Sequence, residues 1–154
     1  MNNVLLVTSP GRDVSKAITY ALQRAREIDG SLVALAVLDP ERPRRIARTL
    51  TNVGFVGEKV SDSVVDTVAR EQQAQADTLL KEIAARARDA GITCTSLIEE
   101  GDPSEVCSRI IQTHNVRAAV LVAEKRSWLT RFLSRAAAVK LPAFAGCEVK
   151  VMEG

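Results

Sequence analysis

The chain alternates short apolar runs with longer stretches in which apolar residues recur every three or four positions. The runs at 3–8, 31–38 and 118–123 are almost wholly aliphatic, as strands buried on both faces of a parallel sheet must be. The run at 93–99 is less hydrophobic, and that at 147–152 alternates apolar with charged residues, which is typical of edge strands. The pattern therefore predicts five strands, two of them at sheet edges.

Helical spacing of apolar residues predicts the segments between these strands. Residues 14–28 carry the i, i+3, i+4, i+7 stripe of an amphipathic helix. Asp29-Gly30 is expected to end this helix, with the glycine in the left-handed cap conformation. Residues 103–115 and 128–141 predict two further helices, the first begun at a proline and the second stopped by one.

The stretch between the second and third strands is the least regular. Residues 61–90 predict a long helix ended by Gly91, and its length indicates a bend or an N-terminal part that belongs to the preceding loop. Residues 40–60 contain a charged run, two prolines and two glycines, which indicates a variable, mobile connection with one or two helical turns at 44–51. Its arginines are expected to form a solvated surface.

The order of these elements predicts the fold class. A strand, a helix and a strand within the first 38 residues form a βαβ unit, whose strands are parallel with a right-handed crossover. Continued along the chain, this order gives an α/β fold, a doubly wound Rossmann-like sandwich with a five-stranded parallel sheet between helices. A chain of 154 residues fits one domain, 1–154.

Composition and charge narrow the class of function. The formal net charge is +2, too small to indicate nucleic-acid binding. No apolar run approaches the length of about 20 residues that a membrane span requires, and no leader pattern precedes the first strand. The sequence therefore predicts a cytoplasmic protein that binds no nucleic acid.

The residues able to carry chemistry are few and scattered. Cys94, Cys107 and Cys147 are far apart, and His114 is the single histidine, so no metal site and no structural disulfide are predicted. The cysteines are expected to be small buried hydrophobes. His114 stands at the end of a predicted helix, where a cation complements the helix dipole. No nucleophile has a general base near it in the sequence, so no enzyme is predicted.

Five segments together resemble a known family. Four are AITYAL at 17–22, AGI at 90–92, HNVRAAVLV at 114–122 and AGCEVKV at 145–151, and the most specific is Glu100-Gly101-Asp102-Pro103. In this order and spacing they are similar to motifs of the universal stress protein family over essentially the whole chain. The resemblance implies the strand order 3-2-1-4-5.

The resemblance also locates a nucleotide pocket that this chain has altered. Family members that bind ATP carry G-x-x-G and, about nine residues later, G-[S/T] after the fourth strand, so that backbone amides approach the phosphates. The three glycines fall here at Ala123, at Arg126 and at Arg135 or Ala136, and the acidic residue after strand one falls near Ser9. We therefore expect that ATP is not held in the family's manner and that no cofactor is needed.

Two functions stay open. The first is a non-enzymatic stress-response protein of the non-ATP-binding kind, acting through homodimerisation and protein partners. The second is a nucleotide- or anion-binding regulatory module with a divergent pocket after strands one and four, for which ATP or AMP would be the ligand. The candidate pocket comprises Ser9, Asp39, Gly101, Ala123, Arg126 and Arg131. A weak ATPase is a further alternative, which the missing phosphate loop disfavours.

Two surfaces are candidates for contacts with partners. In the family, dimers commonly form by pairing the final edge strands, which here offer Cys147, Glu148, Val149, Lys150 and Val151. The second surface is the basic segment 125–135 around Trp128. It is interpreted in three ways: a protein- or membrane-binding patch, a set of arginines that hold an anion, or a solvated helix packed through its apolar residues.

Overall fold

A computed structural model describes residues 2–8, 13–52, 54, 58–123 and 147–153 of the chain. Its five strands form one sheet in the order β3-β2-β1-β4-β5, and all four neighbouring pairs are parallel. The predicted fold class and strand order are confirmed, with boundaries shifted by at most two residues. The strands are β1 Asn3–Thr8, β2 Ser31–Leu38, β3 Cys94–Glu100, β4 Val116–Ala123 and β5 Glu148–Glu153.

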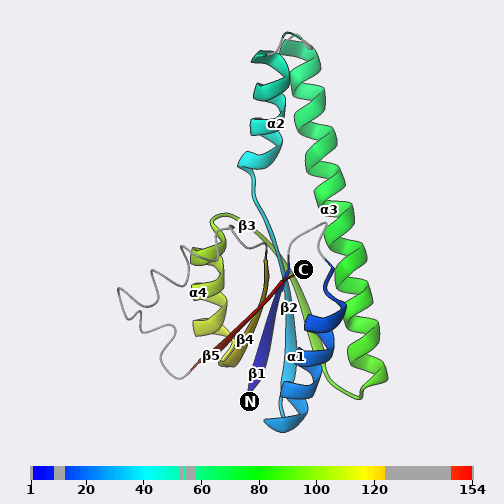
Figure 1. Ribbon diagram of the computed structural model, residues 1–154, viewed down its shortest axis with the longest axis vertical. Helices are drawn as coiled ribbons and strands as arrows, with labels where there is room; N and C mark the ends of the chain where they lie inside the picture. Colours follow the sequence, from blue (N-terminus) through cyan, green and yellow to red (C-terminus); the bar gives the residue numbers. More distant parts are fainter. Residues whose placement is uncertain (1, 9–12, 53, 55–57, 124–146, 154) are drawn as a thin grey trace.

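Helices cover both faces of this sheet (Figure 1). Those described are α1 Ser15–Glu27, α2 Glu41–Asn52, α3 Glu58–Asp89 and α4 Pro103–Thr113. The helix predicted at 128–141 lies outside the described residues. No helix within the described ranges combines the length and apolarity that crossing a membrane requires.

The core consists of two apolar layers that the sheet separates. On one face Leu6 and Val120 pack with Ile18 of α1 and Ile83 of α3. On the other face strand residues of opposite parity pack with α4, among them Leu5, Val7 and Leu121 against Ile110 and Ile111. The central strands are therefore buried on both sides, which explains why their sequences are continuous aliphatic runs.

The turn between α1 and β2 differs from its prediction. Asp29, not Gly30, adopts the left-handed conformation, with a φ of 52°. Gly30 is required for another reason, because an added Cβ would lie 2.3 Å from the carbonyl oxygen of Asn2. That same oxygen accepts a hydrogen bond from the Ser31 amide at 3.0 Å, where β1 and β2 begin to pair.

The segment after β2 is more regular than the sequence indicates. The helical turns predicted at 44–51 are confirmed, but they belong to a longer helix, α2, of 12 residues. The alternative that the N-terminal part of the long helix belongs to the preceding loop is wrong, because α3 runs continuously for 32 residues from Glu58, a length of about 48 Å. Pro43 is compatible with α2 because it lies in the first turn, where no interior hydrogen bond is lost.

Only the second half of α3 covers the sheet. Its contributions to the core begin at Ala76 and continue through Leu80, Ile83 and Ala87. The first half lies beside α2, and the two helices project together beyond the sheet (Figure 1). We call this projection the arm, defined as α2 with residues 58–72 of α3. Ala47 is buried on α2, and Val64, Val65 and Val68 are half-buried on α3, so an apolar seam explains why both helices form.

Candidate functional site

The carboxyl ends of the strands gather the residues of the predicted pocket. In a parallel sheet all these ends lie at the same end of the sheet, where ligands usually bind. We call this end the carboxyl edge, as distinct from the edge strands β3 and β5. Leu38, the last residue of β2, pairs with Glu100 of β3, and the Gly101 amide donates to the Leu38 carbonyl at 3.2 Å. Asp39 and Gly101 are therefore neighbours. Ala123 ends β4 at the same edge, where it pairs with Glu153.

Asp39 is already engaged at this edge. One carboxylate oxygen accepts the Glu41 amide at 2.9 Å, and the other lies 2.7 Å from Nη2 of Arg45. The first contact satisfies an amide of the opening turn of α2, and a carboxylate there also suits the helix dipole. Asp39 thus starts the arm, and any ligand at this residue would compete with two existing bonds.

Gly101 and its neighbours form the turn from β3 into α4. The φ of Gly101 is 139°, a conformation that side-chain-bearing residues rarely adopt. The Asp102 carboxylate accepts hydrogen bonds from the amide and the hydroxyl of Ser104, each at 2.9 Å, and Pro103 opens the helix. Each residue of Gly101-Asp102-Pro103 therefore has a local structural reason to be present.

A second candidate site is the edge strand β5. It pairs with β4 from Ala118–Glu148 to Ala123–Glu153, and the sheet order leaves its other side at the edge. Cys147 and Val149 pack toward α4, whereas Met152 packs toward α1. Val151 is 38% exposed, and among the side chains that the structure describes no other large hydrophobic residue is as exposed.

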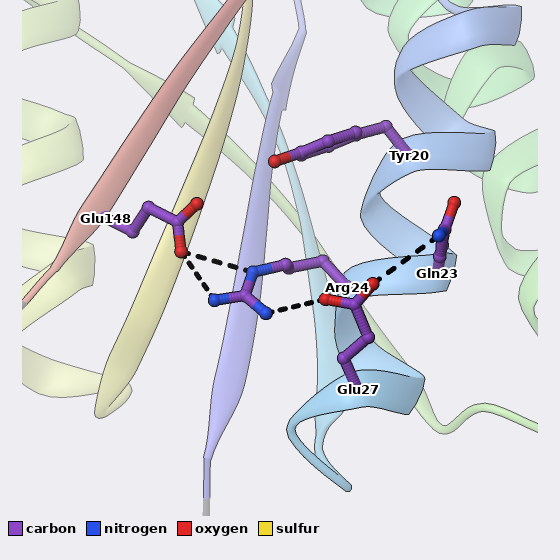
Figure 2. Close-up of a pocket in the computed structure, with 5 residues that line it drawn as sticks. All are labelled: Tyr20, Gln23, Arg24, Glu27 and Glu148. Carbon is purple, nitrogen blue, oxygen red and sulfur yellow. Dashed lines mark hydrogen bonds and ion pairs between the residues drawn. The ribbon is translucent and has the colours of Figure 1, made fainter.

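A polar cluster ties β5 to α1 (Figure 2). Nη2 and Nε of Arg24 donate to Oε2 of Glu148 at 2.5 and 3.2 Å, and Nη1 of Arg24 lies 2.7 Å from Glu27. Nζ of Lys150 lies 5.8 Å from the centre of the Tyr20 ring, within the range of a cation–π contact. The pocket beside these groups has a volume of about 300 Å³ and is lined by Tyr20, Gln23, Arg24, Glu27 and Glu148.

A model of the universal stress protein family matches residues 1–149. The chain belongs to the universal stress protein family. No curated protein matches the chain.

Solved universal stress proteins share the fold at low sequence identity. UspA from Lactobacillus plantarum is 18% identical with a TM-score of 0.66, over 98% of this chain and 97% of that one. A family protein from Arabidopsis thaliana with AMP bound is 14% identical, with a TM-score of 0.62, over 99% of this chain and 92% of that one. The Archaeoglobus fulgidus protein in complex with dAMP is 13% identical, with a TM-score of 0.61 over 98% and 96%. These likenesses support the fold alone.

The described structure of this universal stress protein brings together part of the predicted pocket. Asp39, Gly101 and Ala123 lie at the carboxyl edge, where β2, β3 and β4 end. Ser9, Arg126, Arg131 and the patch around Trp128 lie outside the described residues, so their roles stay predictions. Sequence reasoning missed the contact of Arg24 with Glu148. No local pattern could have revealed it, since the two residues are 124 positions apart.

The three cysteines are free thiols, and the expectation that all are buried holds only for Cys107, since Cys94 and Cys147 are half-buried. Burial raises the pKa of the Cys107 thiol to about 12, and Asp102 adds to the effect. Burial raises the pKa of Cys147 to about 11, with a smaller contribution from Glu148, and burial also raises the pKa of Cys94. All three are therefore protonated near neutral pH. Within the described ranges, no group of three potential metal ligands occurs.

Proposed function

We propose that the protein is a non-enzymatic universal stress protein that does not bind ATP. It forms a homodimer by pairing β5 of two copies, and it acts through contacts with protein partners. The observation that carries the dimer is Val151, an exposed large hydrophobic residue on a strand at the edge of the sheet. Exposed edges with apolar side chains are sites of pairing with another chain. A two-fold axis would cover the same edge on both copies.

The side chains of β5 favour one register of pairing. Opposite residues in an antiparallel pair share a face, so a symmetric pairing is centred on one residue. Centred on Val149, it places Glu148 opposite Lys150 of the partner subunit, twice, and Cys147 opposite Val151. Centred on Lys150, it would oppose two like charges. Both hydrogen bonds from Arg24 use Oε2 of Glu148. No residue in the described part of the chain donates to Oε1, which can therefore accept from the partner's ammonium group.

Val151→Lys is expected to convert the dimer to monomer. The new ammonium group would lie against apolar side chains at the seam without a carboxylate to pair with, which is expected to weaken association by at least about 100-fold. Light scattering at about 50 µM protein, where a dissociation constant in the micromolar range gives mostly dimer, measures the mass directly.

The matched control is Thr95→Lys. Thr95 is exposed on β3, the strand at the opposite edge of the sheet, so this variant adds the same charge to an edge that the proposal leaves unpaired. It should keep the dimer mass. A wild-type chain that is monomeric at this concentration, or equal effects of both substitutions, would contradict pairing through β5.

The lack of ATP binding is supported by the sequence at the carboxyl edge. Backbone amides reach phosphates closely only where side chains are absent, and the positions that would provide them hold Ala123, Arg126 and Arg135. The existing bonds of Asp39 add to this, because its carboxylate is committed to Arg45 and to the start of α2.

Isothermal titration with ATP and AMP is therefore expected to give no saturable heat at ligand concentrations up to about 1 mM. The same titration tests the alternative of a divergent pocket, because that pocket would use Arg126 as a charged ligand. A micromolar dissociation constant that Arg126→Ala abolishes, while Arg117→Ala does not, would replace our proposal with the alternative. Arg117 suits as the control because it is an exposed arginine at the opposite end of β4.

A further inference from the structure

One side of the arm carries a basic row and an acidic row. Arg44 and Arg48 lie one turn apart on α2, with side chains 65% and 68% exposed. Asp62 and Asp66 lie one turn apart on α3, and both are exposed. Each row is about 6 Å long, because its two members are four residues apart and a helix rises about 1.5 Å per residue.

The two rows face the same way. Arg44 and Arg48 stand three positions before and one position after Ala47, which belongs to the apolar seam of the arm. Asp62 and Asp66 stand three positions before and one after Val65, which belongs to the apolar stripe of α3. The angular offsets from the seam are therefore equal on the two helices. Two antiparallel helices are related by a two-fold axis perpendicular to the plane that contains them. This rotation keeps each side of the plane on the same side, so equal offsets place both rows on one broad side of the arm.

The charges of the two rows are not neutralised by each other. Glu41 contacts both arginines, with Nη1 of Arg44 at 3.1 Å and Nη2 of Arg48 at 4.0 Å, and so holds both guanidinium groups to one side. One carboxylate thus faces two cations. Asp62 and Asp66 form no ion pair with any residue in the described part of the chain.

We propose that this side of the arm binds the same side of the arm in a second copy of the chain. A two-fold axis parallel to the helices lays α2 of one copy on α3 of the other. Arg44 and Arg48 of each copy then face the acidic row of the partner, so that all four rows are paired. The contact is isologous and closes on two copies. It does not use β5 and therefore stands independently of the proposed function.

The size of this surface sets the expected strength of the contact. The 12 residues of α2 span about 18 Å, so two arms bury an area at or below the low end for specific complexes. The association is therefore expected to be weak and to depend on ionic strength, because exposed charges are screened by salt.

Two charge-reversed variants test the proposal. Arg44→Asp with Arg48→Asp makes every row acidic, and Asp62→Arg with Asp66→Arg makes every row basic. Each variant alone should fail to self-associate through the arm. An equimolar mixture should associate at least about tenfold more tightly than either variant alone, because each row then meets its opposite. Sedimentation equilibrium in about 20 mM salt measures this, and about 500 mM salt should remove the difference.

Two further conditions make the test specific. All chains carry Val151→Lys, so that pairing through β5 does not contribute to the measured association. Far-UV circular dichroism and thermal unfolding establish that each variant is folded before mixing. A mixture that associates no more tightly than its separate variants would overturn the proposal. Loss of self-association on reversal of the arginines but not of the aspartates would also overturn it, and would show that α2 faces a different anionic surface.

Discussion

Gly30→Ala is expected to lower the free energy of unfolding by about 2–4 kcal/mol. The added methyl group would lie 2.3 Å from the Asn2 carbonyl oxygen and 3.2 Å from Cδ1 of Ile28. The first neighbour is backbone at the start of β1 and cannot move without loss of its hydrogen bond from Ser31. Overpacking of this kind costs about 1–3 kcal/mol, and the lost hydrogen bond adds about 1 kcal/mol. Urea unfolding followed by circular dichroism measures the change.

Gly91→Ala provides the comparison for this substitution. Gly91 has a φ of 72°, and a Cβ there meets nothing within 4 Å. Its cost is therefore conformational alone, about 1–2 kcal/mol. If Gly30→Ala is no more destabilising than Gly91→Ala, the close approach of Gly30 to Asn2 does not constrain the fold.

Ile83→Ala is expected to destabilise the protein by about 2–5 kcal/mol. Ile83 is fully buried where α3 packs on the sheet, and truncation of a buried isoleucine loses transfer free energy and leaves a cavity. Ile46→Ala removes the same atoms from α2 in the arm, where Ile46 is half-buried. It is expected to cost less than half as much, since exposed atoms were never fully removed from water. Equal costs in denaturant unfolding would mean that the arm is as well packed as the core.

The sheet could be predicted from the sequence because its signals are local. Continuous aliphatic runs such as those of β1 and β2 require burial on both faces, and burial on both faces requires a parallel sheet covered by helices. The two less hydrophobic strands, β3 and β5, lie at the edges as predicted. The positive φ of Gly91 was likewise predictable, since that glycine directly follows the end of a long amphipathic helix.

The pairing of α2 with α3 in the arm could not be predicted because it depends on a contact between two helices. Taken alone, the charged run at 40–60 indicates a solvated connection with one or two helical turns at 44–51. The structure adds two stabilising contacts that periodicity does not report: the bonds of Asp39 at the start of α2, and the apolar seam against α3. The role of Gly30 escaped prediction for the same reason, since a glycine after a helix indicates a cap and Asn2 is distant in sequence.

The candidate site was predictable in position but not in detail. The carboxyl edge follows from the topology, which brings Asp39 beside Gly101. The existing partners of Asp39 cannot be predicted in this way, because the sequence does not distinguish an aspartate that caps a helix from one that binds a ligand. The attachment of β5 to α1 by Arg24 also depends on tertiary structure alone.

The central place of β1 has a consequence for synthesis on the ribosome. Leu5 pairs with Val33 on one side and with Ala119 on the other, so its two neighbours emerge far apart in time. At about 5–20 residues per second, the second neighbour follows β1 by about 6–23 seconds. During this interval a nascent β3-β2-β1 sheet would present β1, a largely aliphatic strand, as an uncovered edge, open to pairing with other chains. Protection by a chaperone would be needed most before β4 emerges.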